Sequence, residues 1–179
     1  MRSVRRWFPL PPIVVRTLTL AALGVAASGL AAPRAARAQE VAPVERASVL
    51  AAVQGVLDAI AHRDTSAARQ WMQPGAVLFA LPPTAGGPVR RQSDSSFVAF
   101  LGASTDHFLE RIWTPQVMVR GGLAEVWAPY DFHVNGRRSH CGIDSFTLVR
   151  GPAGWRVAAI AYTVETTGCV DSPLGPPPA

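Results

Sequence analysis

The sequence contains no lysine, and its basic residues are unevenly distributed. All 17 basic side chains are arginines, and six of them lie in residues 1–38, which contain no acidic residue. The other 11 arginines share residues 39–179 with 12 carboxylates, so this part carries about −1 although the whole chain carries +5. A protein that binds a nucleic-acid backbone needs a surplus of basic side chains to displace counterions. Residues 39–179 are therefore not expected to bind nucleic acid or an anionic membrane.

The sequence also lacks the short motifs of the common cofactor and metal sites. It has no P-loop, no GxGxxG fingerprint and no Ser-nucleophile elbow, and neither HxxxH nor CxxC spacing occurs. The histidines are scattered along the chain, so we expect neither a metal centre nor a cofactor. Repeats and heptads are absent too, and 49 % apolar residues argue against a disordered chain. The roughly 140 residues after position 38 suit one domain with one core.

The first 38 residues have the layout of a secretory signal peptide. Three arginines within the first six residues precede an apolar run at residues 17–30, and a small-residue stretch then ends at Ala36-Arg37-Ala38. This order predicts cleavage before Gln39. The alternative is an uncleaved membrane anchor, but the run has about 14 residues, whereas a spanning helix needs about 20.

The pair Arg5-Arg6 also resembles the start of a twin-arginine signal. Pro9 and the lack of a Ser or Thr before the pair depart from that pattern. With either export route, the mature protein is predicted to be periplasmic or secreted and to have no membrane attachment after cleavage.

Hydrophobic periodicity predicts a long amphipathic helix at the start of the domain. Pro43 can open this helix, which ends near His62. Asp64 or Thr65 can cap a second helix that runs through Met72. The apolar stripe of the first helix consists of Val49, Val53, Val56, Leu57 and Ile60.

A hairpin and a third helix are predicted next. Ala76–Leu81 has the composition of a strand, and a Pro- and Gly-rich turn leads to a short return strand at residues 89–92. Ser93 can then cap the third helix.

The periodicity changes to two in the second half of the chain. From Ala124 to Val134 every second residue is apolar, and Gly121-Gly122 and Asn135-Gly136 on either side are hairpin signals. Two further strands are expected at about 138–150 and 155–166. With the strand that the Gly121-Gly122 hairpin implies before it, this makes four consecutive antiparallel strands after three helices, which predict an α+β fold.

The segments Ser139–Phe146 and Gly154–Thr163 resemble the nuclear transport factor 2-like (NTF2-like) superfamily, in particular its SnoaL-like and lumazine-binding bacterial members. The resemblance covers about residues 44–169, and the order of the elements agrees throughout. It implies a cone, in which a strongly curved antiparallel sheet wraps around the long first helix and encloses a cavity, as in the cystatin-like or ketosteroid-isomerase-like roll. Such proteins are often dimeric, so a homodimer is expected. Members include isomerases, polyketide cyclases, dehydratases and binding subunits, so the fold leaves the function open.

The predicted turns set a provisional register for the last three strands. It opposes Asp131 to His140, Trp127 to Asp144, and His140 to Glu165, so these polar side chains share one face. A bulge at Pro129 or Gly142 would invert part of this assignment. The other face carries Tyr130, Cys141, Ile143, Ile160, Tyr162 and Val164 in this register.

His140 is the predicted acid–base residue, with Asp131 or Asp144 orienting it. A neighbouring carboxylate raises the pKa of an imidazole and fixes its tautomer, which suits proton transfer near neutral pH. The alternative is a solvated ladder of charges on the outer face of the sheet.

Three aromatic residues, Trp127, Tyr130 and Tyr162, are the predicted ligand-binding residues, because their rings can stack on a flat aromatic molecule. They could equally be ordinary core residues.

The two cysteines, Cys141 and Cys169, raise two alternatives. An even cysteine count in an exported protein suggests a disulfide. An extended strand after Val164 would instead hold the two sulfurs roughly 16 Å apart. A bridge therefore requires Gly168 to let the chain fold back, and otherwise both cysteines remain thiols.

Two functions are favoured at this point, and a purely structural or dimerising role is the third alternative. The first is an exported domain, residues 39–169, that binds a small apolar or aromatic molecule and is followed by a disordered Pro-rich tail at 170–179. The second is an enzyme of the isomerase, cyclase or dehydratase type, in which Tyr162 or Tyr130 polarises a carbonyl group if a bulge brings it to the side of His140.

Overall fold

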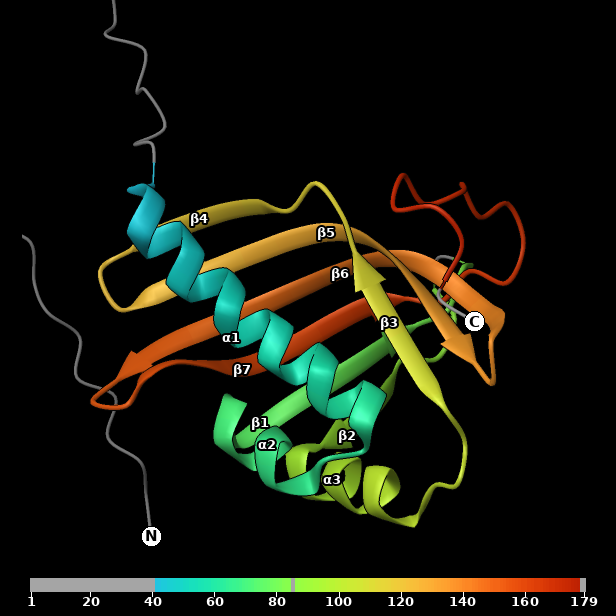
Figure 1. The fold of residues 1–179 in the computed structure, drawn as a ribbon, viewed down its shortest axis with the longest axis horizontal. Coiled ribbons are helices and arrows are strands. Elements are labelled where there is room, and N and C mark those ends of the chain that lie inside the picture. Colours follow the sequence, from blue (N-terminus) through green and yellow to red (C-terminus); the bar gives the residue numbers. More distant parts are fainter. Residues whose placement is uncertain (1–40, 85, 178–179) are drawn as a thin grey trace, which may run out of the picture. The chain divides into compact units, whose positions relative to one another are not determined.

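The computed structural model describes residues 41–84 and 86–177, which hold three helices and seven strands (Figure 1). The predicted signal peptide at residues 1–38 lies outside these residues. In chain order the elements are α1 (Pro43–His62), α2 (Thr65–Trp71), β1 (Met72–Leu81), β2 (Arg90–Ser93), α3 (Asp94–Ala103), β3 (Phe108–Ile112), β4 (Gln116–Arg120), β5 (Leu123–Val134), β6 (Arg137–Gly151) and β7 (Gly154–Thr163).

All strands belong to one sheet with the order β2-β1-β7-β6-β5-β3, and β4 also pairs with β5. The sheet is mixed, because β1 and β7 run parallel whereas the other neighbours are antiparallel. The α+β fold with a curved sheet is confirmed, and the parallel pair is the departure from the expected antiparallel sheet. Local periodicity carries no information about the relative direction of two strands so far apart in the chain.

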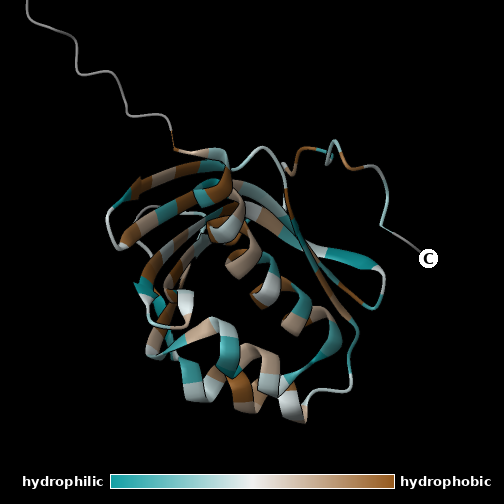
Figure 2. Ribbon diagram, turned by 60° about the vertical axis from the view of Figure 1, so that its left-hand side comes forward, coloured by the Kyte–Doolittle hydropathy of each residue, from teal (hydrophilic) through white to brown (hydrophobic). Residues whose placement is uncertain are grey.

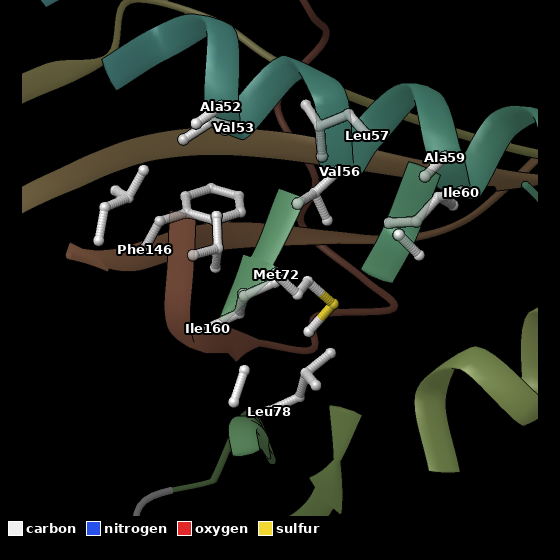
Figure 3. Close-up of a cluster of buried hydrophobic side chains, with 14 of the residues drawn as sticks. Ala52, Val53, Val56, Leu57, Ala59, Ile60, Met72, Leu78, Phe146 and Ile160 are labelled. Atoms are coloured by element: carbon white, nitrogen blue, oxygen red, sulfur yellow. The ribbon is translucent and has the colours of Figure 1, made fainter. Parts of the chain in front are cut away.

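Helix α1 lies across the concave side of the sheet and supplies the centre of the core (Figure 1). Its predicted stripe is buried, with Val49, Val53 and Val56 completely inaccessible. Figure 3 shows the α1 side chains pointing toward Phe146 and Ile160 of the sheet. Figure 2 shows hydrophobic residues concentrated where α1 and the strands face each other. The helix bounds also agree with the prediction.

The caps of the shorter helices are confirmed. Asp64 accepts hydrogen bonds from the N–H groups of Ser66 and Ala67, and Ser93 accepts one from Ser96. Strand β1 begins at Met72 rather than at Ala76, because a register shift against β7 accommodates the intervening Pro-Gly pair.

The second half of the described chain holds five strands rather than four. The segment before Gly121 divides into β3 and β4, which pair with opposite ends of β5. The break falls at Thr114, whose φ of +43° no strand can contain, and at Pro115, which cannot donate a backbone hydrogen bond.

The predicted register is wrong beyond the β5–β6 turn, although the turn itself is as expected. Val134 faces Arg137 across Asn135-Gly136, but a bulge then leaves Ser139 unpaired. From that point Asp131 faces Cys141 instead of His140, and every β6 side chain lies on the opposite face from the expected one. The bulge is at neither Pro129 nor Gly142.

A second bulge shifts β7 by one residue against β6. The register changes between Thr147 and Leu148, so Tyr162 faces Asp144 instead of Ile143. Glu165 pairs with Cys141 rather than with His140. The two bulges together place His140, Asp144 and Tyr162 on the same, concave face.

Cys141 and Cys169 form a disulfide, with their Cα atoms 5.8 Å apart. The extended chain that would separate them ends at Glu165, and a positive φ of 74° at Gly168 turns the chain back toward β6. A stable disulfide indicates a compartment outside the reducing cytosol. No helix within residues 41–84 and 86–177 is long and apolar enough to cross a membrane.

Candidate functional site

A cavity of about 300 Å³ lies between the concave face of the sheet, α1 and α3. This volume is at the small end of the range for small-molecule sites. The exposed side chains of Arg90 and Phe100 belong to its mouth, whereas its deeper wall is apolar. The deeper residues include Val56, Leu57, Leu78, Leu101, Phe146 and Ile160.

Six of the aromatic rings that line the cavity form a continuous wall. Successive ring centroids lie between 4.9 and 6.4 Å apart, and the His140 ring is stacked on that of Phe132. Rings at these separations present flat faces and polarised edges to a ligand. In order along the wall they are Phe100, Phe108, Phe132, His140, Tyr130 and Tyr162.

Two carboxyl groups, those of Glu110 and Asp144, interact inside the site. Glu110 lies on β3 and lines the cavity, while Asp144 lies on β6 and is only 1 % exposed. Neither Asp144 oxygen receives a hydrogen bond from an N–H or O–H donor of the described residues. A hydrogen bond between the two groups therefore requires a proton on one of them.

Burial decides where that proton resides. Burial, together with the charge of Glu110, raises the pKa of Asp144 well above its usual range, so Asp144 keeps its proton and is able to donate it in a hydrogen bond to Glu110. Burial also raises the pKa of Glu110 to about 7, although the hydrogen bond from Asp144 opposes this rise. Glu110 is therefore the carboxyl group that changes its charge near neutral pH.

The two cavity tyrosines differ in what their hydroxyl groups can do. The Tyr130 hydroxyl donates a 2.7 Å hydrogen bond to the Thr163 carbonyl oxygen. A side chain at Gly142, which lies opposite Tyr130, would collide with Thr163, so this contact needs glycine there. The Tyr162 hydroxyl makes no hydrogen bond within the described residues and is free for a ligand. Burial and Glu110 raise the pKa of Tyr162, whereas Arg90 lowers it.

His140 lines the cavity but does not form the predicted pair with an aspartate. No hydrogen bond or ion pair joins it to Asp131 or Asp144 within residues 41–84 and 86–177. Burial and the positive charge of Arg90 lower the pKa of His140, so its imidazole is neutral at pH 7. His140 therefore contributes an uncharged ring to the wall.

Asp131 lies on the convex face, away from the cavity. Its carboxylate accepts hydrogen bonds of 2.9 and 2.6 Å from Arg111, and His133 lies 3.3 Å away. Burial alone would raise the pKa of Asp131, but the hydrogen bonds from Arg111, together with the nearby His133 side chain, outweigh burial and lower it. The described part of the tail packs here too, because Arg111 also donates to the Gly175 carbonyl oxygen.

Trp127 does not line the cavity either. Its side chain is 49 % exposed, and it alternates on β5 with the buried Val126 and Ala128. Of the three predicted ligand-binding aromatic residues, the structure therefore places Tyr130 and Tyr162 at the cavity and Trp127 outside it.

Comparison with solved structures identifies the fold. A candidate dehydratase of the NTF2-like family from Streptomyces avermitilis superposes with a TM-score of 0.54 at 15 % identity, over 68 % of this chain and 96 % of that one. A candidate aromatic ring hydroxylase from Novosphingobium aromaticivorans gives 0.57 at 16 % identity, over 70 % and 92 %. An NTF2-like protein of unknown function from Shewanella baltica gives 0.52 at 15 % identity, over 69 % and 96 %.

The chain has the NTF2-like fold. A protein from Nostoc punctiforme with a cystatin-like fold is also similar, with a TM-score of 0.53 at 12 % identity, over 72 % of this chain and 82 % of that one. No family model matches the sequence, and no curated protein sequence is similar to it. These likenesses establish the NTF2-like architecture and leave the chemistry to the residues of the cavity.

Within this NTF2-like fold, sequence reasoning missed Glu110 and Arg90. The alternation of Phe108, Glu110 and Ile112 was the available signal, because it places an acid between two apolar residues on the inward face of a strand. Arg90 gave no comparable signal. Its proximity to the cavity depends on the pairing of β2 with β1, which no local pattern encodes.

Proposed function

We propose that the cavity binds a small, mostly apolar carbonyl compound and transfers a proton to and from a carbon atom beside the carbonyl group. The observation that carries this proposal is the pair of Glu110 and Asp144, in which one carboxyl group has a pKa of about 7 inside an aromatic cavity. A base works best when its pKa is close to the working pH. This chemistry is shared by isomerases and dehydratases.

Glu110 acts as the base in this proposal. Its carboxylate takes the proton from the carbon atom, the C–H electron pair forms the carbon–carbon double bond of an enolate, and the negative charge moves to the carbonyl oxygen. Return of the proton from Glu110 to another carbon atom gives an isomer. If the proton on Glu110 exchanges with deuterated water before it returns to the carbon atom, the substrate becomes labelled with deuterium.

Tyr162 and Asp144 support the charge changes of this step. The free Tyr162 hydroxyl can donate a hydrogen bond to the enolate oxygen, which stabilises the charge that develops there. Asp144 stays protonated and holds the Glu110 carboxylate through a hydrogen bond, so it is a positioning residue. The Tyr130 hydroxyl donates its hydrogen bond to the Thr163 carbonyl oxygen, and this bond holds the Tyr130 ring in place in the aromatic wall.

Binding without chemistry is the second candidate function, and the mainly apolar and aromatic lining of the cavity favours it. A binding protein needs only a complementary shape and an apolar lining. The Glu110 carboxyl group in this lining argues against simple binding of an apolar ligand, because burying a carboxylate without a counter-ion is unfavourable.

Export completes the proposal. The arginine-rich leader at residues 1–38 is a signal peptide in our interpretation, and the Cys141–Cys169 disulfide is consistent with an oxidising compartment. The working protein is then residues 39–179 in the periplasm or outside the cell.

The test is the exchange of carbon-bound protons of a neutral ketone such as β-tetralone, followed by NMR in deuterated buffer. The protein should accelerate exchange at the carbon beside the carbonyl, and Glu110→Gln should reduce this acceleration by about 100-fold or more. Glu125→Gln is the matched control, because Glu125 accepts a hydrogen bond from the Thr147 hydroxyl and does not line the cavity. Bound ketone without any accelerated exchange would leave a binding protein and contradict the catalytic proposal.

A further inference from the structure

Arg90 is a positively charged side chain at the mouth of the cavity that no acid neutralises. It lines the cavity from β2 and is exposed. Within residues 41–84 and 86–177, its guanidinium group makes no ion pair and no side-chain hydrogen bond. An arginine without a partner beside a ligand cavity retains all of its donors for the ligand.

The sheet register places Arg90 in line with the catalytic groups. Arg90 pairs with Ala80, Ala80 with Tyr162, and Tyr162 with Asp144, so these four residues form one row across four strands. Arg90 and Tyr162, on either side of Ala80 in this row, both line the cavity. The charge of Arg90 reaches into the cavity, because it lowers the pKa values of both His140 and Tyr162.

The polar groups of the site are therefore of two kinds, one cationic and the others acidic. Arg90 is at the mouth, Glu110 of β3 lines the cavity, Asp144 of β6 lies outside this lining, and the aromatic wall lines the same cavity. A guanidinium group binds a carboxylate through two parallel hydrogen bonds, which fix the orientation as well as add affinity. A ligand held in this way would present its ring to the wall and its reactive carbon toward Glu110.

We propose that the natural ligand is a small aromatic or alicyclic carboxylic acid, whose carboxylate binds Arg90 at the mouth while its ring lies against the aromatic wall. This inference rests on the proposed function of the cavity and adds the class of the substrate. Arg90 is then the residue that determines specificity, and it takes no part in the proton transfer.

The neighbouring Arg91 provides a matched control. It follows Arg90 on the same strand, so its side chain lies on the opposite face, and it does not line the cavity. Both arginines are exposed. Replacing either one by glutamine removes the same charge from the same strand, and only the position relative to the cavity differs.

The experiment compares naphthoate with naphthamide, which has nearly the same shape but no charge. Binding of each compound is measured by fluorescence at constant ionic strength and pH 7. The protein should bind naphthoate about tenfold more tightly than naphthamide, as expected for a charge-assisted bidentate contact. Arg90→Gln should remove this preference and leave the affinity for naphthamide unchanged, whereas Arg91→Gln should alter neither.

Equal affinity of the unmodified protein for the two compounds would overturn the inference. An equal loss of naphthoate binding in Arg90→Gln and Arg91→Gln would also overturn the inference, because it would mean that positive charge on β2 attracts naphthoate nonspecifically. The exchange of β-tetralone protons is a separate readout, since this ketone carries no charge. Glu110-dependent exchange without any preference for naphthoate would refute only the substrate class, and an Arg90-dependent preference without exchange would refute only the catalytic proposal.

Discussion

Asp131 and Asp144 lie on neighbouring strands, are each only 1 % exposed, and face opposite sides of the same sheet. On the convex side, Arg111 donates two hydrogen bonds to Asp131, and the pKa of that carboxyl group is lowered. On the concave side, Asp144 faces the carboxyl group of Glu110, and its pKa is raised. Two aspartates that are equally inaccessible to solvent thus differ in charge. Asp131 is a stable anion, and Asp144 is a neutral acid.

The two carboxyl groups differ in their partners. A buried carboxylate is unfavourable unless a cation compensates for the lost hydration. Arg111 provides this compensation on the convex side, so that site stabilises the fold. The concave site retains an uncompensated pair, and such displaced pKa values are typical of functional sites.

The largest expected effect on stability separates the two aspartates directly. Asp131→Asn should lower the free energy of unfolding by about 3 kcal/mol, because it leaves the buried Arg111 without its charge partner. Asp144→Asn should cause no comparable loss, since asparagine replaces an acid that is already neutral. Urea unfolding of the two variants measures both changes. Equal losses in the free energy of unfolding would contradict the difference between the two sides of the sheet.

The disulfide tests whether the convex side is structural as a whole. The Cys141→Ser/Cys169→Ser double variant should lower the free energy of unfolding by roughly 3 kcal/mol, because the bridge closes a loop between residues 28 positions apart. The rate of ketone proton exchange should be unchanged in the folded double variant. A large fall in that rate would mean that the convex side also controls the cavity.

The dependence of stability on pH is a smaller effect with a definite sign. Glu110 has a pKa of about 7 in the folded protein and an ordinary value of 4.5, so between these values the folded state keeps a proton that the unfolded state releases. Stability should therefore fall as the pH rises from about 4.5 to about 7, and Asp144 contributes in the same direction. Glu110→Gln should make this decline shallower when unfolding is compared at both ends of the range, whereas Glu125→Gln should not.

The elements of the fold could be predicted because their signals are local. The stripe of α1 repeats every three to four residues, β5 alternates in polarity, and Asn135-Gly136 has the backbone angles of a tight hairpin turn. The parallel pairing of β1 with β7 could not be predicted, because nothing in either segment specifies a distant partner. The same limit applies to the approach of Glu110 to Asp144.

The site was only partly predictable because one unpaired residue changes the face of a strand. The sequence pattern favoured His140, Asp144 and Tyr162, of which His140 and Tyr162 line the cavity, but the bulge at Ser139 inverts β6 relative to β5. A bulge at a serine leaves the alternation of neighbouring residues intact on either side, so no pattern in the sequence predicts it. Consequently His140 does not pair with an aspartate as predicted, and the partner of Asp144 is Glu110.

The smallest expected effect concerns Trp127, which the cavity does not include. Trp127→Ala should leave naphthoate affinity within about twofold of the unmodified protein, because the side chain lies on the opposite face of the sheet. Phe132→Ala is the comparison, since Phe132 contacts both Phe108 and His140 in the aromatic wall and its loss should weaken binding. A greater loss for Trp127→Ala than for Phe132→Ala would place the ligand on the convex side.

The most direct test of the account is the titration of the five glutamate carboxyl groups by carbon-13 NMR. We predict one carboxyl signal that titrates near pH 7, that is absent from Glu110→Gln and that persists in Glu125→Gln. If every glutamate instead titrated close to its ordinary value, Glu110 would be an ionised carboxylate throughout the neutral range, and the displaced pKa on which the account rests would be contradicted.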